Sequence, residues 1–275
     1  MHASLFFVPA LAASAWAAPT YPMLDRAARL PDSISVISEY FNLLASKVQE
    51  SRLLDIPPAC DLSQIPQPAG AADLPSPSAG LSLRHIAIGR GTQNYTCDAA
   101  TPDAAPQAAG AVATLFNASC LVAVSPDLAA ALTRAALHFD LSQSISWGRA
   151  GNGKGWGSLA PSNLAPSGLH FFADATTALF KLDVSPDLQL GELPCGKNAS
   201  VPAPPSDAAS SRGLEGEPPV AWLKLNAKPG ATGGLQEVYR FQTVGGSAPA
   251  TCHGMPEEFQ VQYAAQYWFY AKQES

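Results

Sequence analysis

The segment that decides the fold is "FQVQYAAQYWFYA", which runs from Phe259 to Ala271 near the end of the chain. Its side chains alternate in character, as they do along a β-strand, where successive residues point to opposite faces. One face carries Phe259, Val261, Tyr263, Ala265, Tyr267 and Phe269. The other face carries Gln260, Gln262, Gln266, Trp268 and Tyr270. This segment is therefore the clearest strand of a β-rich chain.

Five other segments are predicted to be strands, because each is short, rich in β-branched or aromatic residues, and bounded by Gly or Pro. They cover residues 81–89, 110–120, 169–183, 220–228 and 235–244. Two segments show helical spacing instead: residues 31–54, with Asp32 or Ser33 as the N-cap, and the residues that follow Ser125-Pro126-Asp127. We expect a mainly β fold, a sandwich or irregular barrel with two peripheral helices.

The chain is predicted to have three parts. Residues 1–17 read as a secretory signal peptide, because an apolar run precedes the small-x-small pattern Ala15-Trp16-Ala17. Residues 18–80 are expected to form an N-terminal helix and a connection rich in Pro and Ala, and residues 81–275 a β-rich domain. No later apolar run approaches the roughly 18 to 20 residues that cross a bilayer, so we expect a secreted, extracellular protein without a membrane anchor.

The charge of the chain argues against two classes of partner. The sequence has 16 Lys and Arg against 22 Asp and Glu, a net charge of −6, and no cluster of basic residues. Nucleic acids and anionic membranes bind through such clusters, so neither is expected as a partner. The sequence does not predict the oligomeric state.

The cysteines and the sequons fit an oxidising compartment. No two of the five cysteines form a C-x-x-C pair, so neither a zinc site nor a redox motif is expected from Cys60, Cys97, Cys120, Cys195 and Cys252. Two disulfides and one free thiol are expected, and 15 arrangements remain open, since any of the five can be left out and four cysteines pair in three ways. Sequons at Asn94, Asn117 and Asn198 indicate N-glycosylation, which would require these side chains to face water.

Motifs for cofactors and metals are incomplete. The stretch "GRAGNGKGWGS", Gly148 to Ser158, differs from a phosphate-binding loop because Gly155 replaces the Ser or Thr that binds magnesium, and no strand and helix flank it. We interpret it as a glycine loop. No two histidines have H-E-x-x-H or H-x-H spacing, so no metal site and no cofactor are predicted.

Several strands together resemble a family of secreted fungal proteins, with bacterial relatives, known as domain-of-unknown-function 3455. The resemblance is carried by "GRGTQNYTC" (89–97), "GAVATLFNASC" (110–120), "VAWLKL" (220–225), "GLQEVYRFQTVGG" (234–246), "APATC" (248–252) and "VQYAAQYWFYA" (261–271). The family has no agreed activity. The resemblance favours a Cys97–Cys252 disulfide, because both residues end conspicuous family segments.

Some fungal members of that family carry the name malate dehydrogenase. Such an enzyme needs G-x-G-x-x-G between a strand and a helix, whereas here Gly89-Arg90-Gly91 is followed by Tyr95 and Thr96 in place of a third glycine and a helix. We therefore judge the name unsupported by the sequence.

The polar face of the last strand is the first candidate site. Gln266, Trp268 and Tyr270, extended by Trp222 and Tyr95 if their strands are neighbours, could hydrogen-bond to sugars and stack on them. The alternative is that these aromatic rings are core residues on the second face of the fold.

The second candidate site is catalytic. Along one strand His170 and Asp174 point to the same side and could pair, giving an oriented imidazole, although a structural histidine is the simpler interpretation. No G-x-S-x-G motif is present. The sequence thus favours an extracellular binding protein, with polysaccharide as a candidate ligand, over an enzyme. The alternatives are a secreted hydrolase with an unrecognised carboxylate or histidine site, and a structural protein without a small ligand.

Overall fold

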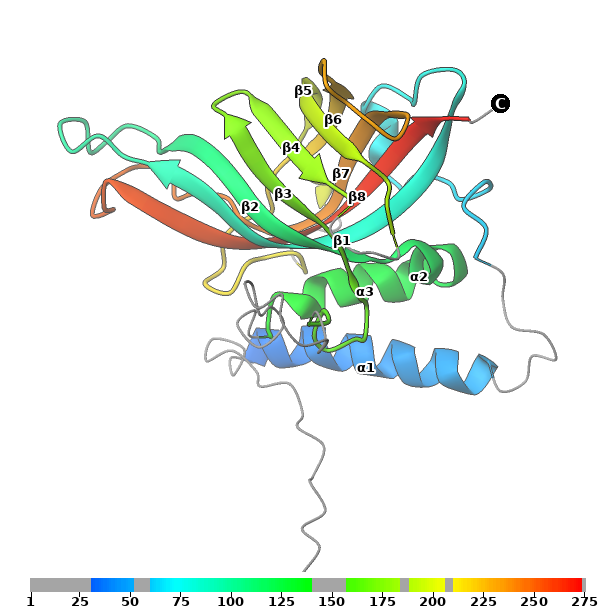
Figure 1. Ribbon diagram of the computed structural model, residues 1–275. Helices are drawn as coiled ribbons and strands as arrows, with labels where there is room; N and C mark the ends of the chain where they lie inside the picture. Colours follow the sequence, from blue (N-terminus) through cyan, green and yellow to red (C-terminus); the bar gives the residue numbers. More distant parts are fainter. Residues whose placement is uncertain (1–30, 52–59, 140–156, 184–187, 206–209, 274–275) are drawn as a thin grey trace, which may run out of the picture.

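The computed structural model describes residues 31–51, 60–139, 157–183, 188–205 and 210–273 (Figure 1). The predicted signal peptide, residues 1–17, lies outside these ranges, as does the glycine loop except for its last two residues. All statements below concern the described residues.

Eight antiparallel strands form a closed barrel, in which each strand pairs with the next along the chain and the last pairs with the first (Figure 1). The strands are β1 (Leu81–Thr96), β2 (Gln107–Asn117), β3 (Pro166–Asp174), β4 (Thr177–Lys181), β5 (Glu192–Val201), β6 (Trp222–Ala227), β7 (Leu235–Gly245) and β8 (Glu258–Lys272). The prediction of a mainly β fold is confirmed, and of the two expected architectures the structure has the barrel.

The barrel closes where β8 pairs with β1 over almost their whole length. A glycine of β1, Gly89, makes room for this seam. A Cβ on Gly89 would lie 2.5 Å from a ring carbon of Tyr267, and Gly91 lies opposite Tyr263. The Gly89-Arg90-Gly91 step is therefore part of a strand that accommodates tyrosine rings, and not the turn of a dinucleotide-binding fold.

The two faces of β8 have different surroundings. Its apolar face points into the barrel lumen, where Tyr267 and Phe269 pack with Phe180, Leu225 and Val238 from other strands. Its other face, which carries Trp268 and Tyr270, points outward and packs in a second hydrophobic cluster that includes the helices. Both faces are buried, which explains why almost no residue from Val261 to Ala271 is exposed.

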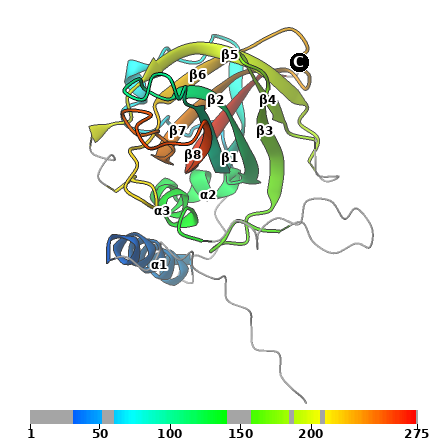
Figure 2. The ribbon, with the colours of Figure 1, turned by 90° about the vertical axis from the view of Figure 1, so that its left-hand side faces the viewer.

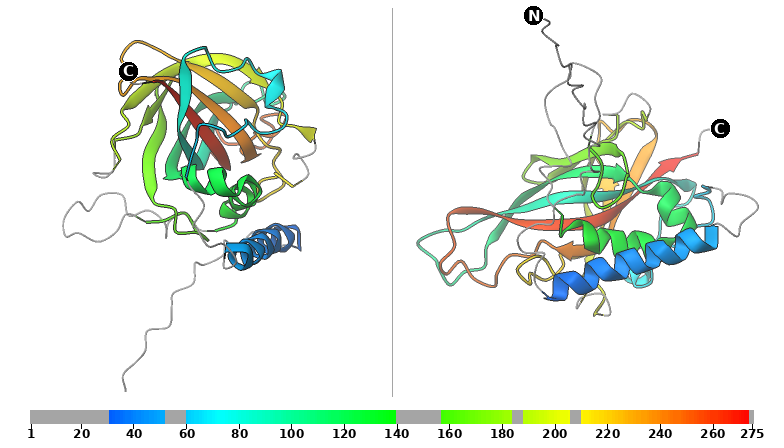
Figure 3. Two further views of the ribbon diagram at one scale, coloured as in Figure 1. Left: turned by 90° about the vertical axis from the view of Figure 1, so that its right-hand side faces the viewer. Right: turned by 90° about the horizontal axis from the view of Figure 1, so that it is seen from below.

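Three helices cover one side of the barrel: α1 (Pro31–Ser51), α2 (Ser119–Val124) and α3 (Pro126–Ala136). α3 packs on the outer face of β7 and β8, and α1 packs on α3 as a further layer (Figures 2 and 3). An ion pair between Arg134 and Glu39, 2.6 Å apart, joins these two helices. The two predicted helices are present, whereas α2 was not predicted. Ser119 and Cys120 belong to α2, because β2 ends at Asn117, whose Oδ1 accepts the Ser119 N–H.

The Pro-rich connection before β1 is irregular, as predicted, but it packs against the barrel. We call residues 67–78 the strap. The Tyr239 hydroxyl donates to the Pro75 carbonyl at 2.7 Å, and the Lys224 ammonium donates to the Ser76 carbonyl at 2.7 Å. Beneath the strap Lys224 and Glu237 form a buried ion pair of 3.1 Å. The Ser78 hydroxyl donates to the same carboxylate at 2.5 Å.

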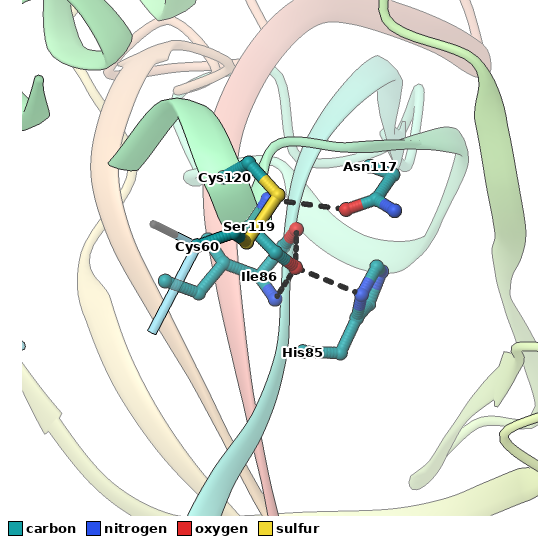
Figure 4. Close-up of a disulfide and its surroundings, with 6 residues drawn as sticks. All are labelled: Cys60, His85, Ile86, Asn117, Ser119 and Cys120. Atoms are coloured by element: carbon teal, nitrogen blue, oxygen red, sulfur yellow. Dashed lines mark hydrogen bonds between the residues drawn. A yellow bond between two sulfur atoms is a disulfide. The ribbon is translucent and has the colours of Figure 1, made fainter. Parts of the chain in front are cut away.

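Two disulfides, Cys60–Cys120 and Cys97–Cys252, are present, and Cys195 is a buried free thiol. This confirms the expectation of two bridges and one free thiol, and it selects the Cys97–Cys252 pairing that the family resemblance favoured. The first bridge ties the segment before the strap to α2 (Figure 4). The second ties the end of β1 to the segment that precedes β8.

Candidate functional site

The structure does not offer the predicted row on β8 to a ligand. Gln266 and Trp268 are each 2% exposed and Tyr270 is 6% exposed. The Trp268 indole N–H donates to Gln266 Oε1 at 3.1 Å, and Gln266 Nε2 donates to Thr133 Oγ1 of α3 at 3.4 Å. These polar groups hold α3 on the barrel and are not free to recognise a sugar.

The other members of that row occupy two different environments. The Tyr270 hydroxyl accepts from Gln67 of the strap at 3.2 Å, and Trp222 is fully buried against Phe241. Tyr95 is half-buried on the lumen side, where its ring stacks on Phe259 and its hydroxyl donates to the Gly246 carbonyl at 2.7 Å. Of the five predicted residues, only Tyr95 lies where a ligand could approach the lumen.

His170 and Asp174 do not pair. His170 Nδ1 contacts the Leu179 carbonyl at 3.2 Å, whereas Asp174 is exposed at the turn between β3 and β4. There Asp174 Oδ1 accepts the Thr176 N–H at 2.8 Å, and this bond, with those from threonine hydroxyls, lowers the pKa of Asp174 to about 2. A register shift between Phe172 and Asp174 breaks the alternation on which the expected pairing depended.

Arg240 of β7 is the functional candidate that the sequence analysis missed. It lies opposite Tyr267 of β8 and Leu223 of β6, and directly opposite residues in antiparallel strands share a face, so its side chain belongs to the lumen. Its Nε and Nη2 donate to the Ala221 carbonyl at 3.1 and 2.8 Å. Arg240 is half-buried, so solvent reaches it. The available signal was a charged residue that alternates with Val238 and Val244 along a predicted strand.

Polar side chains from three other strands share the lumen with Arg240. The Arg240 charge acts on three of them, and the fourth lies beside Tyr263. Together we call them the Arg240 cluster: Gln93, His170, Arg240, Tyr263 and Tyr267. The hydroxyls of the two buried tyrosines are 2.8 Å apart. Gln93 Nε2 is buried and has no hydrogen-bond partner in the part of the chain that the structure describes. The His170 ring stacks on Phe180 and is tilted against Tyr267, with ring centroids 4.2 and 5.6 Å apart.

Arg240 is the only charged member of this cluster at neutral pH. Burial and the neighbouring Tyr267 raise the pKa of Tyr263, and burial raises the pKa of Tyr267, although the positive charge of Arg240 acts in the opposite direction on both. Burial lowers the pKa of His170 to about 4. Within the described ranges no Asp or Glu forms an ion pair with Arg240. The cluster therefore combines one cation with neutral hydrogen-bonding groups.

A second buried histidine lies farther toward the start of β1 and is structural. His85 contacts Ser119 Oγ at 3.1 Å through Nδ1 (Figure 4). Through Nε2 it contacts Ser167 Oγ at 3.0 Å. Ser119 Oγ also accepts the Ile86 N–H at 3.0 Å, and all three side chains are buried. The arrangement anchors α2 to β1. It offers no exposed nucleophile.

The buried histidines His85 and His170 predict that stability falls in acid. Burial lowers the pKa of His85 and of His170 to about 4, from 6.5, so between these pH values the unfolded chain binds protons that the native protein does not. For each of these histidines, lowering the pH from 7.5 to 5 should reduce the free energy of unfolding by about 2 kcal/mol. Denaturant titrations at both pH values should show this loss, and His170→Gln should reduce it by about half. If His170→Gln lost as much stability between the two pH values as the wild type does, His170 would not be a neutral buried residue in the native protein.

The three sequons differ in accessibility. Asn198 of β5 is exposed, whereas Asn94 and Asn117 are half-buried. Asn117 Oδ1 is already engaged by the Ser119 N–H. Of the three asparagines that were expected to face water, Asn198 is exposed, and the other two are only partly so.

One family of proteins matches the chain, and the function of that family is unknown. The model of the family described as "Protein of unknown function (DUF3455)" matches residues 77–271. The chain belongs to this family. The DUF3455 region contains the Cys97–Cys252 disulfide and every member of the Arg240 cluster, whereas α1 lies before it. No curated protein and no solved structure matches the chain.

Two kinds of feature are absent from the described residues of this DUF3455 protein. No helix among them has the length and apolar character needed to cross a membrane. No group of three or more His, Cys, Asp and Glu residues among them is arranged to hold a metal ion.

Proposed function

We propose that this DUF3455 protein is an extracellular binding protein and that its ligand meets the barrel at the Arg240 cluster. The observation that carries the proposal is the half-buried Arg240, which has no ion-pair partner among the described residues and whose charge acts on the buried Tyr263 and Tyr267. A few convergent polar groups against an apolar wall are typical of ligand sites, and eight-stranded barrels can take a ligand at one mouth.

An extracellular location is supported by two independent features. Residues 1–17 have the pattern of a secretory signal peptide, and the two disulfides are of the kind that persists in oxidising compartments. The bridges join residues 60 and 155 positions apart in sequence, so they are part of the tertiary fold rather than of a local redox motif.

Binding is favoured over hydrolysis by the chemistry of the cluster. Glycoside hydrolysis commonly uses two carboxyl groups across the substrate, whereas the Arg240 cluster contains none. Asp174 is held by its own turn, away from His170. The lumen does have half-buried groups that suit a hydroxyl-rich ligand, because Arg240 donates hydrogen bonds and Gln93 and the nearby Tyr95 can both donate and accept them. A polysaccharide therefore remains the proposed ligand, now at the lumen and not on the outer face of β8.

A sedimentation experiment tests this function. The glycosylated protein is incubated for hours with insoluble extracellular polysaccharides, and both the retained protein and the soluble sugar are measured. We expect retention of the protein without release of sugar. Tyr95→Phe, which removes a half-buried hydroxyl on the lumen side within reach of the Arg240 charge, should weaken retention about 5- to 10-fold, the effect of one hydrogen bond.

Tyr270→Phe is the matched control, because it also removes a tyrosine hydroxyl, but from the outer face of the barrel under the strap. Retention of this variant should equal that of the wild type. Release of soluble sugar would instead support the hydrolase, and no retention on any polysaccharide would support a structural protein.

A further inference from the structure

We infer that the ligand of the Arg240 cluster carries a carboxylate, which pairs with the guanidinium of Arg240, so that an acidic polysaccharide built from uronic acids fits the site and its neutral counterpart does not. This inference rests on the proposed function and adds the chemical class of the ligand. It is carried by the charge balance of the lumen, by the orientation of the guanidinium and by an unsatisfied amide beside it.

Among the described residues, the lumen has no negative charge that pairs with the positive charge of Arg240. His170, Tyr263 and Tyr267 are neutral at neutral pH, and burial raises the pKa of the lumen thiol Cys195 to about 12. The nearest buried carboxylate on β7, that of Glu237, is bound to Lys224 beneath the strap on the outer face. A partly buried cation without a counter-ion is costly, and a bound carboxylate would remove that cost.

The guanidinium is held in one orientation by the barrel itself. Both Nε and Nη2 donate to the same Ala221 carbonyl, at 3.1 and 2.8 Å, so one edge of the planar group faces the backbone of the residue before β6. Arginine has five N–H donors, and those of Nη1 and the second of Nη2 lie on the remaining edges. Such an end-on pair of donors matches the two oxygens of a carboxylate.

Gln93 provides a second, independent indication of a ligand. Its Nε2 is buried, and among the described residues no acceptor makes a hydrogen bond of normal geometry with it, although it lies near enough to the Tyr263 hydroxyl to lower the pKa of Tyr263. A buried donor without a well-placed acceptor is destabilising. The side chain lies beside Tyr263, because a Cβ on Gly246 would be 3.2 Å from Gln93 Cγ and 2.8 Å from Tyr263 Cβ. An acceptor atom of the ligand would satisfy this amide, and a carboxylate or sugar hydroxyl provides one.

The single positive charge also selects among anions. A carboxylate carries one negative charge, which Arg240 neutralises. A phosphate monoester carries about 1.5 to 2 negative charges at neutral pH, which would leave uncompensated charge in a partly buried site. The cluster has no second cation to balance it, so a carboxylate suits the site better.

A matched pair of ligands tests the inference. Isothermal titration calorimetry compares trigalacturonic acid with its methyl ester, which has the same sugar backbone and no charge. The wild type should bind the acid at least about 10-fold more tightly than the ester, the effect of one charge-assisted hydrogen bond, and the difference should shrink as salt is added.

Three variants assign that preference to a residue. Arg240→Gln should bind acid and ester equally, whereas Arg240→Lys, which keeps the charge but loses the planar fork, should keep a smaller preference. Arg84→Gln is the control for net charge, because Arg84 is an exposed residue of β1, and it should behave as the wild type. Thermal unfolding of each variant verifies that it is folded.

Equal binding of acid and ester by the wild type, or no binding of either, would overturn the inference, as would an acid preference that persists in Arg240→Gln. If neutral polysaccharides are retained in the sedimentation experiment in these cases, the proposed function stands and only the ligand class is wrong. If retention is absent as well, the proposed function also fails.

Discussion

Replacing both cysteines of the Cys97–Cys252 disulfide by serine should lower the free energy of unfolding by about 5 kcal/mol. The two residues are 155 positions apart in sequence, and the bridge restricts the unfolded chain over that whole length. Loop-closure entropy for a loop of this size gives about 5 kcal/mol at 25 °C, and native bridges commonly contribute about 2 to 5. Chemical denaturation of the double variant and the wild type measures the difference.

Cys195→Ala is the matched control, because it removes a buried cysteine that forms no bridge. Its loss should be only about 1 kcal/mol, which is typical of a single substitution. Two backbone hydrogen bonds, Cys97 N–H to Glu257 O and Cys252 N–H to Ala104 O, each 2.8 Å, also hold the bridged segments together. If the Cys97→Ser/Cys252→Ser variant were as stable as the wild type, the bridge would not contribute to the fold.

Breaking the buried Lys224–Glu237 ion pair should have an effect of similar size. Glu237→Gln leaves the Lys224 ammonium buried without its counter-charge under the strap, where both side chains are about 5% exposed. Removing one partner of a buried pair costs about 3 to 5 kcal/mol. Replacing both residues by apolar ones, Lys224→Met with Glu237→Leu, should recover part of the loss, but the Ser76 carbonyl and the Ser78 hydroxyl would still lack partners.

The Lys181–Glu192 pair is the control for this experiment. Its atoms are 2.8 Å apart and it also joins neighbouring strands, but both side chains are 37% exposed. Exposed pairs contribute about 0 to 1 kcal/mol, so Glu192→Gln should change stability little. Equal effects of Glu237→Gln and Glu192→Gln, measured by denaturation, would contradict the description of Lys224–Glu237 as a buried pair that holds the strap.

Alternation along β8 was enough to predict the strand and the two faces of its side chains. It could not show what covers each face. The amides and aromatics of the outer face looked like a sugar-binding surface, but Gln266 bonds to Thr133, more than a hundred residues earlier in the chain. Which helix or strap packs on a strand depends on long-range contacts, and a single sequence does not contain the positions of those partners.

The strand that the sequence analysis missed shows a different limit. β5 (Glu192–Val201) contains Gly196, Lys197, Asn198 and Ser200, and only two of its ten residues are buried. Its apolar alternation is too weak to distinguish from a loop, and it is a strand because β4 and β6 pair with it on both sides. By contrast, Arg240 could have been noticed, because it alternates with Val238 and Val244 along a predicted strand, and a charge at such a position requires a reason.

The central claim, that ligand is recognised at the Arg240 cluster, is tested most directly by NMR of ¹⁵N-labelled protein titrated with trigalacturonic acid. We predict shifts of the Arg240 Nε–H and Gln93 amide signals at ligand concentrations where the buried indole signals of Trp222 and Trp268 do not move. Shifts of those two indole signals without any change at Arg240 and Gln93 would place the ligand on the outer face of the barrel and contradict the account.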